Sequence, residues 1–145
     1  MAGSNLTSKD VMYNFGSGQW HEALRFADPI FGSTEAMVTR YVSQFGHVPS
    51  DESATCIAAG VSLAFSLQKY GRSLVGLSPS ERRVEIRRSL GQLNDETFFG
   101  RILFDRNNQN VGRLPISWQF KEDGVQRLVL PPEFTVEALR FPSPS

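Results

Sequence analysis

The sequence contains little of what an oxidised, polyanion-binding or membrane-spanning protein needs. Its 145 residues include a single cysteine, Cys56, so no intramolecular disulfide can form. Lys and Arg total 15 and Asp and Glu total 15, which removes the basic excess expected of a nucleic-acid binder. No apolar run approaches the roughly 20 residues of a membrane-spanning helix. We therefore predict a globular domain with no nucleic-acid partner.

Patterns typical of metal sites and catalysis are also missing. The softer metal ligands are His21, His47 and Cys56, and their separations match no zinc-site spacing. The GSG segment at 16–18 has the spacing of neither a phosphate-binding loop nor a nucleophile elbow. Because nothing places a nucleophile beside a base, we predict no metal, no cofactor and no enzymatic activity.

Three segments carry the signals of helices. The first spans about 33–46, between a serine suited to an N-cap and a glycine suited to a C-terminal stop. The second, about 50–70, is rich in alanine and apolar on more than one side, so we expect it to be buried together with Cys56. The third, about 78–91, begins with SPSE, a capping box with proline at the first helical position.

The region after these helices alternates strands and turns. TFFGRILFD (97–105) is typical of a strand, and RNNQNVG (106–112) of a turn. Apolar and polar residues alternate over 116–120, the pattern of a half-buried strand. Glu-Asp-Gly at 122–124 indicates a hairpin before a last strand at 125–130. We thus predict an α/β fold of three helices followed by a β-meander.

These elements divide the chain into three parts. Residues 1–19 are a tail or a remnant strand, 20–130 the folded segment, and 131–145 a tail that begins with two prolines. The N-terminus has no apolar core of a signal peptide, so none is expected in this chain.

The order of the elements resembles the C-terminal part of type I periplasmic binding proteins, the two-lobed Venus flytrap family of branched-chain amino acid binding proteins. Five pieces carry the resemblance. They are GSGQWHEAL, the helix ending in Phe45-Gly46 and followed by Pro49-Ser50, the alanine-rich helix ATCIAAGVSLAFSLQKYG, the short charge-rich helix with Leu90 and Leu93 at its end, and TFFGRILFD followed by NVG and a strand with Gln119. Gly100, Phe104 and Asp105 within TFFGRILFD are the most specific piece.

The resemblance implies a part of a periplasmic or extracellular solute-binding or receptor domain. In that family two lobes close on a small amino-acid-like ligand without catalysis, and the parent protein works with a transporter or a signalling domain. The N-terminal portion, with most of the ligand contacts, would be missing here, and no position matches the family motif for the ligand's amino and carboxylate groups. The alternative function is a stand-alone protein–protein interaction domain.

By the same resemblance, three residues are candidates for ligand binding. Trp20 and His21 fall where the family has the edge of the cleft, so the indole could stack on a ligand and the imidazole donate a hydrogen bond. Glu52 could pair with a ligand amino group. The structural alternatives are a packed tryptophan, an exposed histidine, and acidic residues Asp51 and Glu52 that complement a helix dipole.

The third helix also carries a basic face. Arg82, Arg83, Arg87 and Arg88 lie there beside Glu81 and Glu85. We predict a solvated face with a Glu85–Arg88 pair rather than a phosphate or nucleic-acid site.

Overall fold

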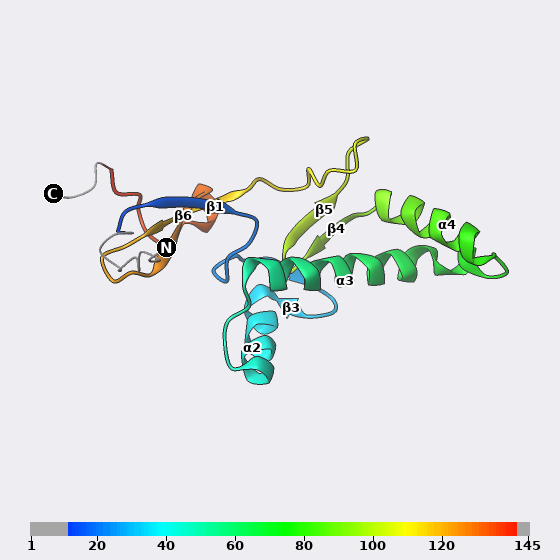
Figure 1. Cartoon of the computed structure of the whole chain (residues 1–145), viewed down its shortest axis with the longest axis horizontal. Coiled ribbons are helices and arrows are strands. Elements are labelled where there is room, and N and C mark those ends of the chain that lie inside the picture. Colours follow the sequence, from blue (N-terminus) through cyan, green and yellow to red (C-terminus); the bar gives the residue numbers. More distant parts are fainter. Residues whose placement is uncertain (1–11, 142–145) are drawn as a thin grey trace, which may run out of the picture.

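The computed structural model describes residues 12–141 and contains three α-helices in that range (Figure 1). All of them begin at the predicted serine N-caps, whose hydroxyl oxygen accepts a backbone N–H of the first turn. Ser78 and Glu81 form the predicted capping box. The helices are α2 (Thr34–Phe45), α3 (Asp51–Tyr70) and α4 (Pro79–Gly91), with a short 3-10 helix η1 (Gly71–Leu74) between the last two.

The strands form small antiparallel sheets. The largest has the order β1-β6-β7 and consists of β1 (Phe15–Gly18), β6 (Ile116–Phe120) and β7 (Gln126–Leu130). Two hairpins complete the set: β2 (Ala27–Asp28) with β3 (Gly32–Ser33), and β4 (Asn94–Thr97) with β5 (Gly100–Leu103).

The predicted three helices and antiparallel strands are present, but the strands do not form one continuous meander. The segment TFFGRILFD is not a single strand: Phe98 and Phe99 form the turn between β4 and β5. β4 consists of the polar residues NDET, so its sequence lacks the alternation of apolar and polar residues that predicts a strand. β5 does not pair with β6, which instead pairs with β1 and β7. The hairpin predicted at 122–124 is confirmed, since Phe120 pairs with Gln126.

Both predicted tails fall partly outside the described residues, which exclude 1–11 and 142–145. Within the described part of the first tail, residues 15–18 form β1. In the second, η2 (Pro132–Phe134) follows β7, and Phe134 packs against the core with its ring 4.9 Å from that of Phe26.

A buried aspartate joins the two hairpins. Asp28 Oδ1 accepts the backbone N–H of Ile30 at 2.8 Å and of Phe31 at 2.7 Å, and Oδ2 accepts that of Phe98 at 2.8 Å. The hydroxyl of Thr34 donates to the carbonyl oxygen of Phe98 at 2.7 Å. The carboxylate thereby satisfies one buried and two partly buried donors, and it holds Phe98 in the centre of the core, where its ring is fully buried.

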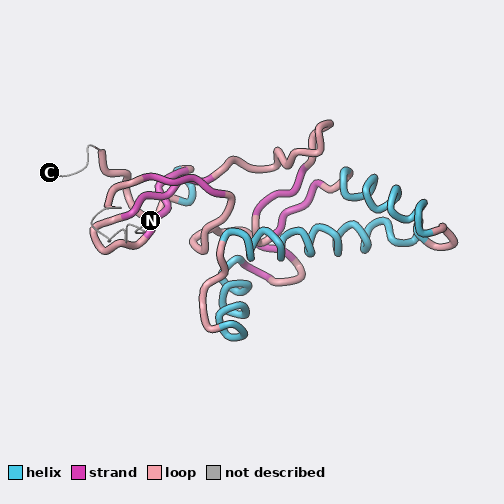
Figure 2. Tube along the Cα trace, viewed as in Figure 1, coloured by secondary structure: helices cyan, strands magenta, loops and turns pink. Residues whose placement is uncertain are grey.

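The chain passes twice between two parts of the molecule (Figure 2). The β1-β6-β7 sheet lies at one end, and the helices with the β4–β5 hairpin lie at the other. Residues 19–26 make the first passage and residues 111–115 the second. The junction between the parts is therefore built from both passages and from the start of α3.

The expectation that α3 is buried on more than one side is wrong for this chain. Its buried face includes Ala54, Val61 and Phe65. The opposite side is exposed, including Cys56, for which burial was predicted. The reason is that no further layer of the described chain lies over this side. We call this exposed set the α3 stripe; at helical spacing it contains Cys56, Ala59, Gly60, Leu63 (40% exposed) and Leu67 (42% exposed).

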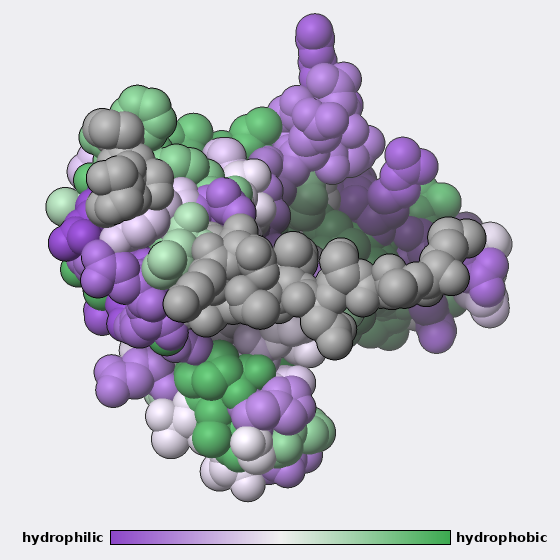
Figure 3. Space-filling model, turned by 60° about the vertical axis from the view of Figure 1, so that its left-hand side comes forward, coloured by the Kyte–Doolittle hydropathy of each residue, from purple (hydrophilic) through white to green (hydrophobic). Residues whose placement is uncertain are grey.

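Apolar side chains are also exposed at the end of α2. Val42, Phe45 and Val48 all lie there, with Phe45 53% exposed. In Figure 3 hydrophobic surface gathers at the lower end of the molecule, where α2 lies. These three side chains and the α3 stripe together expose more apolar surface than isolated surface residues do.

Candidate functional site

A hollow of about 650 Å³ lies at the junction of the two parts. Its walls come from β1, β6, the first passage and the connection between α2 and α3, and they include Trp20, His21, Asp51 and Trp118. This volume is within the range of small-molecule sites, roughly 300–1,000 Å³.

The glycines of β1 make room for one wall of this hollow. Gly16 pairs directly with Trp118 across the sheet. A Cβ atom at position 16 would lie 2.0 Å from Trp118 Cζ2, so the indole occupies the space that any side chain would need. The segment GSG is therefore explained by the packing of Trp118 rather than by a phosphate loop.

Trp20 belongs both to this hollow and to the hydrophobic core. It is 6% exposed and packs with the buried cluster that includes Leu24 and Ile116. Its Nε1 is buried and has no hydrogen-bond partner among the described residues. A buried N–H of this kind is rare in folded proteins, because it loses its hydrogen bond to water without a replacement.

His21 is half-buried at the edge of the same hollow. Its Nδ1 accepts the backbone N–H of Ala23 at 3.1 Å. Burial lowers the pKa of His21 below its ordinary value, and the charge of Arg127 also lowers it, while Glu22 and a hydrogen bond with the backbone of Gln126 act in the opposite direction. The net effect favours the neutral form of the imidazole.

We expect His21 to make folding stability depend on pH. Its folded pKa is lower than the unfolded value of 6.5, so the unfolded chain binds more protons and stability falls as the pH drops through 6.5. The loss levels off below the folded pKa. Urea unfolding of the original chain and of His21→Gln at about pH 7.5 and about pH 5.5 would measure this, and the variant should lose less stability.

His47→Gln provides the matched control, since His47 is exposed on the connection after α2. It should keep the pH dependence of the original chain. Equal pH dependence in His21→Gln and the original chain would contradict a buried neutral imidazole.

Two carboxylates line the hollow, those of Glu22 and of Asp51, which lies in the first turn of α3. Asp51 Oδ2 accepts the backbone N–H of Gln19 at a long 3.4 Å, and its Oδ1 is buried with no hydrogen-bond partner among the described residues. Glu52 is exposed and is not part of the lining. Hydrogen bonds from its own backbone N–H and from the Ser50 hydroxyl lower the pKa of Glu52, as a helix start would.

Sequence reasoning did not single out Arg113, which lies in the second passage. Its guanidinium carbon is 4.3 Å from the centre of the Phe99 ring. Nε and Nη2 are buried without a hydrogen-bond partner among residues 12–141. Burial lowers the pKa of Arg113 to about 10, and the charge of Asp51 partly opposes this shift. Unpaired donors and an unpaired acceptor therefore occur together at the junction.

The junction offers binding groups rather than a catalytic set. It holds two carboxylates, an imidazole and two indoles. Among residues 12–141 no three His, Cys, Asp or Glu side chains gather closely enough to hold a metal ion. Within the same residues, no helix is both long and apolar enough to cross a membrane.

Comparisons with known proteins identify the fold. No family model matches this chain, and no curated protein matches it in sequence. Solved structures do match, among them a leucine-binding protein, LivK, from Thermotoga maritima MSB8, with a TM-score of 0.62 at 17% sequence identity. The match covers 83% of this chain but only 31% of that chain. The predicted fold, that of part of a two-lobed periplasmic binding protein, is confirmed, and the chain spans about a third of that protein's length.

Proposed function

We propose that this chain, which has the fold of the C-terminal part of a type I periplasmic binding protein, completes a solute-binding domain for a small amino-acid-like ligand. The domain would act by closure of its lobes and without catalysis. The complete protein would be periplasmic or extracellular. Its closed conformation would be the one that a transporter or a signalling domain responds to.

The hollow at the junction is the observation that carries this proposal. Its walls come from the β1-β6-β7 sheet on one side and from the start of α3 on the other. A ligand held between them would contact both parts of the molecule, and more closely when they approach. Such a ligand favours the closed state by its additional contacts there.

The side chains at the hollow suit a ligand with an ammonium group and an apolar portion. The Asp51 carboxylate would pair with the ammonium group, and the unpaired Oδ1 supports this. Trp20 and Trp118 would contact the apolar portion, while His21 would hydrogen bond with a polar group. Glu52 would supply a second negative charge at the helix start rather than a direct contact.

The α3 stripe is an exposed apolar surface that a further part of the fold would cover. The matched structure is about three times as long as the segment it shares with this chain, since 31% of it is covered. Cys56, Ala59 and Gly60 are small, and a Cβ at Gly60 would meet nothing within 4 Å. Another layer could therefore approach α3 closely. We propose that the missing N-terminal portion of the same fold covers this stripe.

The test is thermal unfolding of the purified chain with a panel of amino acids, alongside its mass in solution. We expect one amino acid, with leucine as the first choice, to raise the melting temperature, because a ligand at about 100 times its Kd adds about 2.7 kcal/mol of stability. Asp51→Asn should lose most of this shift. Asp105→Asn, in a turn remote from the hollow, is the matched control and should retain it.

A sharp transition of a monomer that responds to no amino acid would contradict the proposal. It would favour a stand-alone protein–protein interaction domain, for which the exposed stripe would be the contact surface. A broad transition with self-association would instead support the proposed requirement for a covering portion.

A further inference from the structure

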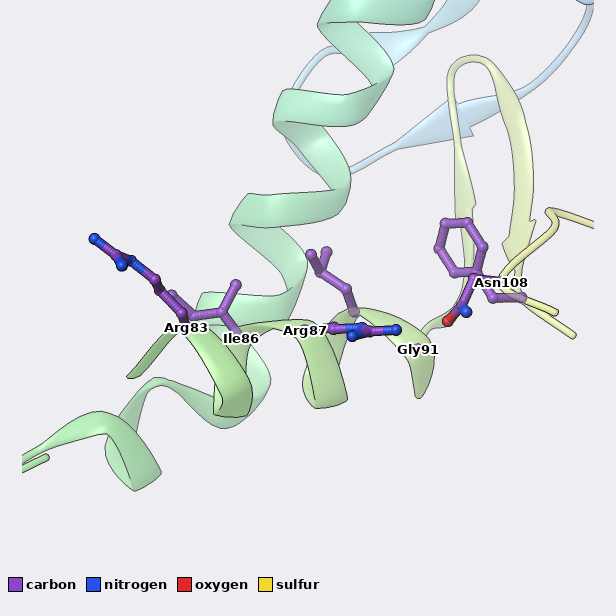
Figure 4. Close-up of a pocket in the computed structure, with 7 residues that line it drawn as sticks. Arg83, Ile86, Arg87, Gly91 and Asn108 are labelled. Atoms are coloured by element: carbon purple, nitrogen blue, oxygen red, sulfur yellow. The ribbon is translucent and has the colours of Figure 1, made fainter. Parts of the chain in front are cut away.

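A second hollow, of about 470 Å³, is shown in Figure 4. Figure 1 shows that α4, which lines it, lies at the opposite end of the molecule from the β1-β6-β7 sheet. The hollow is a groove between α4 and the turn that follows β5. We call it the α4 groove; six of its lining residues are Arg83, Ile86, Arg87, Leu90, Phe104 and Asn108.

The floor of the α4 groove is apolar. Ile86 and Leu90 lie one helical turn apart on α4, and Phe104 faces them from the end of β5. All three side chains are half-buried, and Leu90 and Phe104 also pack against the core. The floor is therefore anchored to the rest of the protein and is not a loose surface feature.

The opposite wall is a turn with its own internal hydrogen bonds. Asp105 Oδ1 accepts the backbone N–H of Asn107 at 2.8 Å and that of Gln109 at 2.9 Å. The backbone N–H of Val111 donates to the carbonyl oxygen of Leu103 at 2.8 Å, which closes the turn. The wall that carries Asn108 is thus preformed, and binding requires little ordering of the chain.

The edge of the groove carries positive charge without a counter-charge. Arg83 and Arg87 extend from successive turns of α4, and in Figure 4 Arg87 points along the groove towards Asn108. Neither arginine forms an ion pair or hydrogen bond with any residue in 12–141. No carboxylate lines the groove, because Glu85 pairs with Arg88, as predicted, and accepts the hydroxyl of Ser73.

We propose that the α4 groove binds a small amphipathic anion, with its apolar body on Ile86, Leu90 and Phe104 and its carboxylate on Arg87. An apolar floor alone would accept any hydrophobic group, whereas the unpaired guanidinium selects a negative one. Its volume suits a small organic molecule. This site does not depend on the function proposed for the junction.

The test is isothermal titration calorimetry of the chain with sodium decanoate and with decylammonium chloride, both below their micelle concentrations. We expect decanoate to bind at least tenfold more tightly, because the two probes share the apolar chain and differ in the sign of the charge. Arg87→Glu should weaken decanoate binding at least tenfold. The arginine is exposed, so the variant should still fold, and circular dichroism would verify this.

Arg82→Glu is the matched control, because Arg82 is an exposed arginine of the same helix that does not line the groove. It should bind decanoate within about twofold of the original chain, since exposed charges remote from a ligand are screened by salt. Equal loss in both variants would overturn the site in favour of general attraction to a basic helix. Equal binding of the two probes, or no decanoate binding, would also overturn it.

Discussion

Asp28→Ala is expected to lower the free energy of unfolding by about 3 kcal/mol or more. The buried backbone N–H of Phe98 and the partly buried N–H groups of Ile30 and Phe31 would lose their acceptor together. A buried donor left unsatisfied costs about 1–3 kcal/mol, and the two partly buried donors add to this. Urea unfolding would measure the loss, and a shifted midpoint with an unchanged slope would identify a change in stability.

Asp28→Asn separates the two halves of this network. Its amide oxygen could still accept from Ile30 and Phe31, but its amide nitrogen would face the N–H of Phe98, donor against donor. We expect a loss between those of the original chain and Asp28→Ala. Asp105→Ala, which removes three hydrogen bonds in an exposed turn outside the core, should cost less. Equal losses in Asp28→Ala and Asp105→Ala would contradict the role assigned to Asp28.

Trp20→Ala should also be strongly destabilising. The side chain is 6% exposed and packs within the core cluster, and truncation of a buried aromatic residue costs about 3–5 kcal/mol. The reason is the cavity that alanine would leave at the junction of the two parts. Chemical unfolding followed by far-ultraviolet circular dichroism would measure the effect without relying on the removed indole.

Trp20→Phe distinguishes packing from ligand contact. Phenylalanine keeps most of the ring volume and removes the buried Nε1–H that has no partner, so stability should change by less than about 1 kcal/mol. If Trp20 also contacts a ligand, this variant should lose part of the ligand-induced rise in melting temperature. A Trp20→Ala chain as stable as the original would show that Trp20 is not a core residue.

Local chemistry sets the ends of the helices, so the sequence was sufficient to predict where they begin and end. Ser33, Ser50 and Ser78 each satisfy a backbone donor within three residues along the chain. The glycine after α2, Gly46, adopts a positive φ of 75° that other residues rarely take. The order of these elements was enough to predict part of a periplasmic-binding-protein fold, as the structural match confirmed.

Contacts between distant segments decided the rest. Residues 94–97 are polar and form a strand only because β5 pairs with them. Phe15 and Gln119 are brought together by the β1–β6 register, and no local pattern marks that pairing. Strand pairing and burial depend on what lies across from a residue, whereas helix caps depend on the next few residues of the chain.

The candidate sites show the same division. Trp20 and His21 were predicted at the cleft edge, and they lie at the junction hollow, but only the tertiary structure brought Asp51 to its wall and left Glu52 outside. It also placed Phe104 opposite α4, which turned an ordinary basic helix face into a groove with an apolar floor. The sequence determined which side chains each element offers, and the packing of elements determined which of them share one space.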